Sequence, residues 1–445
     1  MMLLDLDSAL GGLEDVVPLE LVTPLINPGA DKYSVGPERV RAPSLRGALR
    51  WWFRALFGAV LDVNHLASLE SFLFGSAEEK GLVSTSVRPA GEKGRWKSRV
   101  RTFNGALAGR PSTKYFYYSL QQTGYERAAN VERQLVVPPA EFDLVLGWSP
   151  ATLRAKLEAM SDAKFEKRLG FLGKREGLDV VKFKKFTWAS LFFLLFAGGV
   201  GARTRRAAGR LAVRSGPSER DAKLASKLPR LLRPSPDKSL TEFLRNFVGN
   251  LVKHVGTWVP KGHPQVGLPG HSVVAKGRFK MFVHAKGFKG WMEAVDRLYL
   301  FYHGREVERG NFDGFRFQFK ERQFKKNFFS CASQGDDELR PFLGLPIVFS
   351  KTEAVSAYAG EDEARRASPV WLGVVKWNGR FHPTVSAFKS RFLDVGMAVA
   401  GRGGRIGQGS KPLHDPDAYD DLFNEVWDAL GPREYLPADE WERVF

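Results

Sequence analysis

The sequence predicts an α+β protein of two domains, each an antiparallel sheet with helices on one face. Three observations lead to this prediction. The chain has 445 residues, which is too long for one ordinary domain. Residues 16–26 alternate apolar with other side chains, as a half-buried strand does. Residues 44–57 repeat apolar side chains every three or four positions, as an amphipathic helix does.

Composition favours a folded protein with an anionic partner. Hydrophobic residues make up 43% and charged residues 26% of the chain, which is typical of globular proteins. The formal charge is +18, and the excess Lys and Arg are spread along the whole sequence. A field of this sign attracts polyanions and weakens with salt, so nucleic acid is the first partner to expect. A basic surface without function is the alternative.

Cysteine and apolar content bear on the cellular location. The single Cys331 excludes an intramolecular disulfide and a cysteine-based metal site, which fits a cytoplasmic protein. The strongest apolar run, Phe186 to Ala197, is about half as long as a membrane span. The first residues lack a secretory signal, and no membrane contact is expected. The 34 Phe and 11 Trp predict an aromatic core that leaves some ring faces for base stacking.

In the first half, the predicted elements follow the order strand, helix, strands, helix, strand. Residues 16–26 form the first strand, and Ser44 caps the helix that follows. Gly and Pro separate the central strands, at 82–89, 112–120, 132–139 and 140–148. A second helix at 187–197 leads through a Gly-rich loop to a closing strand at 210–215. This order is the ferredoxin-like plan.

The second half begins after a segment with little periodicity. Residues 216–239 mix Pro, Ser, Lys and Arg, which predicts a linker between a domain at 1–215 and a domain at 240–445. Helices are predicted at 239–255, at 291–302 and near the C-terminus, and strands at 315–324, 343–350 and 368–377.

The first helix carries a row of cations. Arg46, Arg50 and Arg54 recur every four residues and therefore lie on one helix face, away from the apolar stripe. Trp51 also falls outside that stripe, so its ring could stack on a base beside the arginines. The alternative is a solvated polar face with Trp51 buried by a neighbouring loop.

A second candidate site is the Gly/Arg loop, AGGVGARTRRAAGRLAV, from Ala197 to Val213. Glycines let backbone amides converge on a phosphate, and arginines add charge and paired donors. The loop is neither a Walker loop nor a dinucleotide fingerprint, because it lacks the required Lys and third Gly. We predict a clamp for an RNA backbone, with an Arg-rich solvent turn as the alternative. Its expected members are Gly198, Gly199, Gly201, Gly209, Arg203, Arg205 and Arg206, with Arg210 adjacent.

Smaller basic clusters interleave cations with aromatics. They are KFKK with Lys182, Lys184 and Lys185, GRWKSRVR around Trp96, and FKKNFF around Lys325. The Arg/Gly loop at 401–410 has a similar character. Each alone is equally a strand with one solvated face, so they are expected to act only as parts of a basic surface, and the three lysines of KFKK are predicted RNA contacts.

Catalytic motifs are weak. The acidic segment Gln334–Glu338 lacks a second carboxylate strand, and His414 with Asp415 lacks the partner residues of a metal-dependent hydrolase. His263 and His271 share a Gly/Pro loop and could act as general acid or base in RNA cleavage. We predict that the protein is not an enzyme and needs no metal or small-molecule cofactor.

Several of these motifs together resemble a known family. RAPSLRGALRWWFRAL, FLFGS and AGGVGARTRRAAG resemble the RAMP superfamily of CRISPR systems. The doubled Trp and LELVTPLINPGAD resemble its first, Cmr-type subunit in the type III-B effector complex, as do LGLPIVF and RRASPVWLGVV. The resemblance is strong over residues 16–213 and patchy beyond. Members commonly have a Gly directly after the paired arginines, whereas Ala207 and Ala208 precede Gly209 here.

The resemblance implies two ferredoxin-like (RRM-like) RAMP domains with insertions. It also implies a non-catalytic, RNA-binding structural subunit at the end of the complex distal to the crRNA 5′ handle. Such a subunit contacts the crRNA 3′ region or target RNA, and a neighbouring RAMP subunit. Two alternatives stay open: a metal-independent RAMP endoribonuclease that processes CRISPR transcripts with a histidine such as His263, and a scaffold that touches only protein.

Overall fold

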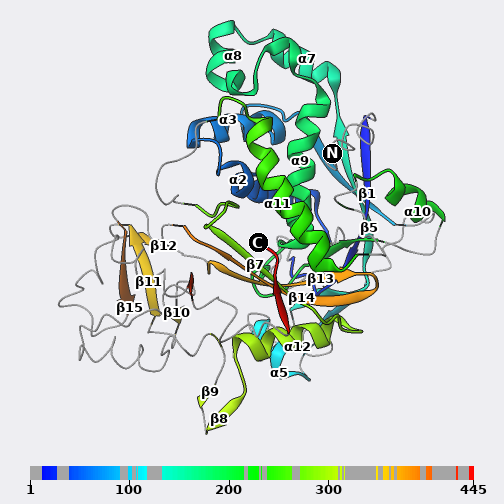
Figure 1. The fold of residues 1–445 in the computed structure, drawn as a ribbon, viewed down its shortest axis with the longest axis vertical. Coiled ribbons are helices and arrows are strands. Elements are labelled where there is room, and N and C mark those ends of the chain that lie inside the picture. Colours follow the sequence, from blue (N-terminus) through cyan, green and yellow to red (C-terminus); the bar gives the residue numbers. More distant parts are fainter. Residues whose placement is uncertain are drawn as a thin grey trace.

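A computed structural model gives the fold (Figure 1). It describes residues 13–27, 40–90, 99–102, 107, 109–117, 133–214, 219–229, 232, 238–262, 271–308, 311–312, 315, 347–348, 354–359, 362–364, 368–390, 397–402, 427–428 and 440–445.

The first half contains a four-stranded antiparallel sheet with the strand order β2-β5-β1-β6. Its strands are β1 (Glu14–Leu21), β2 (Val83–Pro89), β5 (Glu141–Trp148) and β6 (Leu211–Val213). The helices that connect them are α2 (Ala42–Phe57), α3 (Val63–Phe74) and α9 (Val180–Phe196). Strand order and helix positions are those of the ferredoxin-like plan, as predicted.

The second half repeats this arrangement, with the strand order β13-β14-β7-β16. Its strands are β7 (Phe279–His284), β13 (Val370–Trp377), β14 (Arg380–Phe388) and β16 (Trp441–Arg443). Helix α12 (Trp291–Tyr302) connects β7 to β13, and α11 (Leu240–Trp258) precedes β7. Two sheets with the same strand order confirm a protein built from two ferredoxin-like domains.

Insertions enlarge both halves. In the first half they contribute β3 (Arg99–Thr102), α5 (Pro111–Phe116), β4 (Gln134–Val137), α7 (Pro150–Glu158), α8 (Asp162–Leu169), η2 (Gly170–Leu172) and η3 (Arg175–Gly177). In the second half they contribute β8 (Glu306–Glu308), β9 (Asn311–Phe312), β10 (Ile347–Val348), β11 (Ala354–Ala359), β12 (Asp362–Ala364) and β15 (Met397–Arg402). The last four strands form a separate sheet, at the left of Figure 1.

Three expectations about the first half are wrong. The strand predicted at 112–120 is helix α5 over its described part, because Pro111 is favourable in the first helical turn and Phe116 packs into the core. Helix α2 begins at Ala42 after an extended Arg41, so Ser44 lies inside its first turn and does not cap it. Helix α9 begins at Val180, seven residues before the predicted start, with the Asp179 carboxylate accepting from the Lys182 amide.

The segment predicted as a linker contains helix α10 (Glu219–Ser226). This helix contacts β1 and is held to the first sheet by buried ion pairs. Arg214 lies 2.6 Å from Asp221 of α10 and 3.1 Å from Asp143 of β5. Part of the predicted linker therefore packs against the first half.

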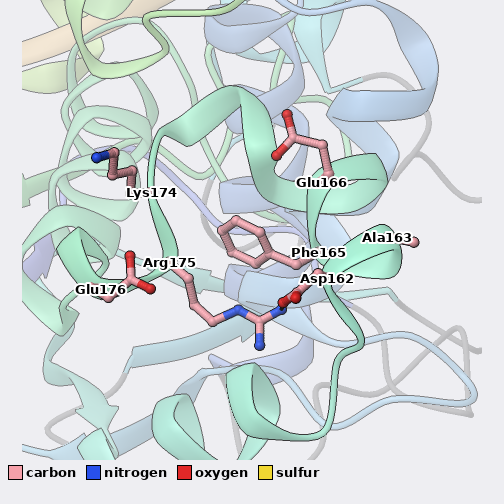
Figure 2. A pocket seen from close by; sticks show the side chains of 7 residues that line it. All are labelled: Asp162, Ala163, Phe165, Glu166, Lys174, Arg175 and Glu176. Carbon is pink, nitrogen blue, oxygen red and sulfur yellow. Dashed lines mark ion pairs between the residues drawn. The ribbon is translucent and has the colours of Figure 1, made fainter.

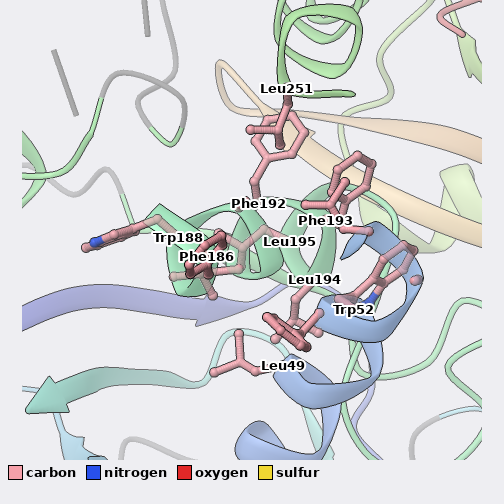
Figure 3. Packing of buried hydrophobic residues seen from close by; sticks show 14 of the residues in the cluster. Leu49, Trp52, Phe186, Trp188, Phe192, Phe193, Leu194, Leu195 and Leu251 are labelled. Carbon is pink, nitrogen blue, oxygen red and sulfur yellow. The ribbon is translucent and has the colours of Figure 1, made fainter. Parts of the chain in front are cut away.

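Helix α9 is the centre of the core. Its side chains are buried all round, which explains an apolar run without amphipathic period. Figure 3 shows Leu49 and Trp52 of α2 and Leu251 of α11 packed on different sides of α9. Trp52 stacks on Phe193 at a centroid distance of 5.6 Å. None of the helices in the described ranges is long and apolar enough to cross a membrane.

The two halves are joined through polar and aromatic contacts. Lys376 of β13 pairs with Glu20 of β1 at 2.7 Å. The aromatic core also continues across the boundary, since Phe193 contacts Phe279 of β7, which contacts Phe388 of β14. The β6 edge of the first sheet and the β13 edge of the second therefore lie next to each other.

Candidate nucleic-acid interface

The three arginines of α2 differ in their surroundings. Arg46 is exposed and has no ion pair with any residue that the structure describes. Arg50 and Arg54 are half-buried and share one carboxylate oxygen of Glu70 in α3, at 2.5 and 2.7 Å. Arg50 also donates to the Gly75 carbonyl at 3.3 Å. Glu70 is buried, so it fixes both guanidinium groups and offsets part of their charge.

Trp51 does not offer the free stacking face that was predicted. Its ring lies 4.7 Å from the ring of Trp371 in β13 and 5.7 Å from that of Phe388 in β14. Both partners belong to the second sheet. Trp51 therefore packs between the two halves. Side chains of the second sheet cover its ring, in place of the neighbouring loop that was the predicted alternative.

The glycines of the Gly/Arg loop allow close packing. A Cβ atom on Gly198 would lie 2.2 Å from the indole nitrogen of Trp52, so only glycine fits against α2 there. Gly209 has a φ of 63°, and a Cβ atom on it would lie 1.9 Å from the Val200 carbonyl oxygen. Gly199 and Gly201 are similarly close to backbone, of Ala208 and Ile26. The physical reason for these glycines is thus found within the chain.

Much of the loop backbone is bonded to the rest of the protein. The Ala207 amide donates to the Leu372 carbonyl at 3.0 Å, and the Leu372 amide donates to the Arg205 carbonyl at 3.1 Å. The Gly209 amide donates to the Pro24 carbonyl at 2.8 Å. Because these amides already have partners, they cannot also bind a phosphate. Fewer backbone amides are therefore available for the predicted clamp, and its main donors to a phosphate would be side chains.

The paired arginines of the loop lie over aromatic rings of the second half. The Arg205 guanidinium is 4.9 Å from the ring centroid of Trp371. The Arg206 guanidinium is 4.5 Å from the ring of Tyr302 and donates to its hydroxyl at 2.8 Å. Arg203 is half-buried with a φ of 63°. All three keep part of their surface accessible.

A short segment after β1 brings the helix and the loop together. The Ser44 hydroxyl of α2 donates to the Asn27 side-chain oxygen at 3.3 Å. The adjacent Ile26 carbonyl accepts from the Ala202 amide at 2.8 Å. The start of α2 and the loop therefore both adjoin this segment, while Arg205 and Arg206 of the loop reach side chains of the second half. We name this set the basic seam; it consists of Arg46, Arg50, Arg54, Arg203, Arg205 and Arg206.

The lysines of KFKK lie in the first turns of α9, and one of them cannot reach a ligand. Lys184 is fully buried, where its ammonium pairs with Asp15 at 3.0 Å, so its predicted RNA contact is wrong. Burial raises the pKa of Asp15 against the opposing effect of Lys184. Lys182 is half-buried and donates to the Leu172 carbonyl, and Lys185 is half-buried.

Arg210 is a residue whose role sequence reasoning missed. It is fully buried, donates to the Ala197 carbonyl at 2.6 Å and reaches Thr384 of β14 at 3.3 Å. A Cβ atom on Gly373 of β13 would lie 1.2 Å from its guanidinium. Burial lowers the pKa of Arg210. In the sequence it looked like one more cation of the loop, and nothing there signalled that it crosses between the halves.

The histidine candidates give no catalytic site in the described residues. His271 packs against Gly58, where burial and the nearby Arg54 lower its pKa. His263, which was predicted to share a loop with His271, lies outside the described residues. The same is true of His414, Asp415, residues 334–338, Trp96 and Lys325. Of the 401–410 loop, residues 401–402 belong to β15. No group of side chains suited to a metal ion occurs in the ranges that the structure describes.

A shallow hollow of about 520 Å³ lies at α8 and η3, and none of the predicted site residues lines it (Figure 2). Asp162, Glu166 and Glu176 line it together with Lys174 and Arg175. Arg175 pairs with Asp162 at 3.0 Å. With both signs of charge present, this hollow does not suit a polyanion.

Comparison with known proteins adds an independent result. The RAMP superfamily matches residues 18–212. The CRISPR system Cmr subunit Cmr1-1 of Pyrococcus furiosus is 29% identical over 361 residues, 79% of this chain and 81% of that protein. Subunit Cmr1-2 of the same organism is 42% identical over 72 residues, 16% of this chain and 37% of that protein. The crystal structure of apo Cmr1 from Pyrococcus furiosus has a TM-score of 0.51 at 18% identity, covering 98% of this chain and 99% of that one, which shows a shared fold.

Proposed function

This chain belongs to the RAMP superfamily, and we propose that it is a non-catalytic, RNA-binding structural subunit of a type III-B Cmr complex. In this role it contacts the crRNA 3′ region or target RNA and docks a neighbouring RAMP subunit in the cytoplasm. Its relatives from Pyrococcus furiosus are named as Cmr subunits, which supports the assignment to such a complex.

The basic seam is the observation that carries the RNA-binding part of the proposal. Two elements that are about 140 residues apart in sequence contribute its six arginines, and both elements contact the segment after β1. Guanidinium groups bind phosphate oxygens in paired hydrogen bonds. Since most loop amides have partners inside the protein, phosphate contacts through side chains are expected to dominate.

The surroundings of the arginines predict how much each contributes to RNA affinity. Arg46 is exposed, and Arg205 is half-buried with its guanidinium 4.9 Å from the ring centroid of Trp371. Arg50 and Arg54 share Glu70, so a phosphate would have to compete with that carboxylate. We therefore expect Arg46 to contribute more to RNA affinity than Arg50.

Binding of single-stranded RNA at several salt concentrations tests the proposal. Replacing Arg46 or Arg205 by Ala should weaken binding, and each lost phosphate contact should reduce the slope of log K against log salt by about 0.7. The matched control is Lys253→Ala on the exposed face of α11, which removes a charge elsewhere. Unchanged affinity and slope in both arginine variants would exclude the basic seam as the binding site.

Incubation of the purified protein with CRISPR repeat RNA separates this proposal from the endoribonuclease alternative. We expect the RNA to stay intact. Specific cleavage that His263→Ala abolishes would replace the structural role by a catalytic one. Absence of any RNA affinity, with assembly into the complex preserved, would leave only the protein scaffold.

A further inference from the structure

A second surface next to the basic seam combines aromatic rings with cations. It is formed by Tyr115 of α5 in the first half and by Tyr299 and His303 at the end of α12 in the second half. We name these three residues the aromatic platform. All three residues are half-buried, so none of them is fully enclosed by the protein.

The three rings contact one another directly. Tyr299 and His303 are one helical turn apart, and their rings are parallel within 12° at a centroid distance of 4.7 Å. The Tyr115 ring is nearly perpendicular to both, at 5.6 Å from Tyr299 and 4.9 Å from His303. These contacts fix the orientation of each ring, so little conformational freedom is lost when another flat group packs on them.

The short helix α5 is anchored where it meets α12. Arg110 and the Ser112 hydroxyl both donate to the Asp296 carboxylate of α12. On the inner side, Phe116 is buried and lies 6.3 Å from Tyr299 between ring centroids. The aromatic platform thus has a firm base that both halves of the chain contribute.

Its charge suits a polyanion. Lys114 and Arg305 are exposed beside Tyr115 and His303 in the chain. Asp296, where α5 meets α12, is paired with Arg110. Tyr302, directly before His303, carries the Arg206 guanidinium of the basic seam over its ring. The aromatic platform is therefore continuous with the basic seam.

We propose that the aromatic platform stacks an unpaired base of the same RNA strand whose phosphates the basic seam binds. This inference rests on the proposed function. Single-stranded nucleic acid fits both features, since its phosphates need cations and its exposed bases need ring faces. Stacking on such rings tolerates every base, so the site contributes affinity for unpaired RNA without reading sequence.

The test compares two ligands on the full-length chain. One is a single-stranded RNA of about 20 nucleotides, and the other has the same backbone with abasic sites in place of its bases. Wild type should bind the intact RNA more tightly by about tenfold or more. Tyr115→Leu with Tyr299→Leu should remove most of this preference while the affinity for abasic RNA stays the same, and Tyr115→Phe with Tyr299→Phe should retain it because the rings remain.

Each outcome decides between distinct possibilities. Equal affinity of wild type for both ligands, or a preference that survives the double Leu variant, overturns base stacking here but leaves phosphate binding at the basic seam intact. Absence of binding to either ligand overturns both proposals. An unchanged RNA preference together with lost assembly into the complex would assign the aromatic platform to a protein partner instead. Unfolding midpoints of the variants, measured in parallel, show that each is folded.

Discussion

At the scale of single residues, the spacing of charges predicts which side chains share a helix face but not what they meet. Arg46, Arg50 and Arg54 lie on one face of α2, as their spacing of four residues predicts. Glu70, which binds two of them, lies in a different helix, and its approach depends on how α3 packs. Lys184 shows the same limit, because its partner Asp15 precedes it by 169 residues. Local pattern cannot reveal such long-range pairs.

One buried residue predicts a dependence of stability on pH. His284 at the end of β7 donates from Nδ1 to the Lys286 carbonyl at 3.0 Å and accepts at Nε2 from Arg297 at 3.2 Å. This arrangement requires the neutral ring. Burial lowers the pKa of His284 to about 4; the hydrogen bond to the Lys286 carbonyl opposes this shift, and the charges of Arg297, His382 and Lys286 add to it.

The unfolded chain binds this proton first, because its histidines have a pKa of about 6.5. As far as His284 is concerned, the free energy of unfolding should therefore be highest above pH 6.5 and should fall as the pH decreases toward 4. His284→Gln cannot titrate, so its stability should fall less steeply in this window, by up to about 1.4 kcal/mol per pH unit. Urea unfolding of both proteins at several pH values measures the difference, and parallel curves would contradict the role of His284.

At the scale of elements, hydrophobic period predicts those strands and helices that have one buried face. Helix α12 has its predicted bounds, β5, α11 and β13 lie within a few residues of theirs, and β1 ends at Leu21, five residues before the predicted end. The start of α9 was missed because a helix buried all round has no amphipathic pattern. Helix α5 was missed because its aromatic residues also suit a strand, and its packing on α12 decides the outcome. The boundaries of the two domains stay a prediction.

The Gly/Arg loop gives a prediction about its glycines. Gly209→Ala should lower the free energy of unfolding by about 2 kcal/mol or more, since φ is positive and the new Cβ would clash with Val200. Gly47 is the matched control. It lies exposed in α2 with no atom near its would-be Cβ, so Gly47→Ala should stabilise by about 0.5 to 1 kcal/mol. Denaturant unfolding compares the two, and a Gly209→Ala variant as stable as wild type would show that the loop can rearrange.

At the scale of the whole molecule, the resemblance to a family predicted two domains of one kind, and the strand orders confirm it. It did not predict how closely the halves join. Trp51, Arg205 and Arg210 look like parts of a surface in the sequence, yet each contacts the second sheet. Side chains at a boundary between domains carry no sequence signal of their own, because the partner surface is formed by distant residues.

This joining predicts cooperative unfolding. Calorimetry of wild type should show one transition, because breaking the boundary exposes the buried Arg210 and the shared aromatic core together. Arg210→Ala should lower the midpoint and separate the transition into two. Lys253→Ala should leave the curve unchanged. Two separate transitions in wild type would contradict tight coupling of the halves.

The position of Arg210 also affects how this protein is made. Thr384, which its guanidinium contacts, follows it in the chain by 174 residues. At typical translation speeds, Thr384 leaves the ribosome about 10 to 35 seconds after Arg210. Until then the site that buries the Arg210 guanidinium is incomplete. The guanidinium stays hydrated, because a charge without partners is costly to bury. Folding of the first half around Arg210 is therefore completed only after β14 has been synthesised.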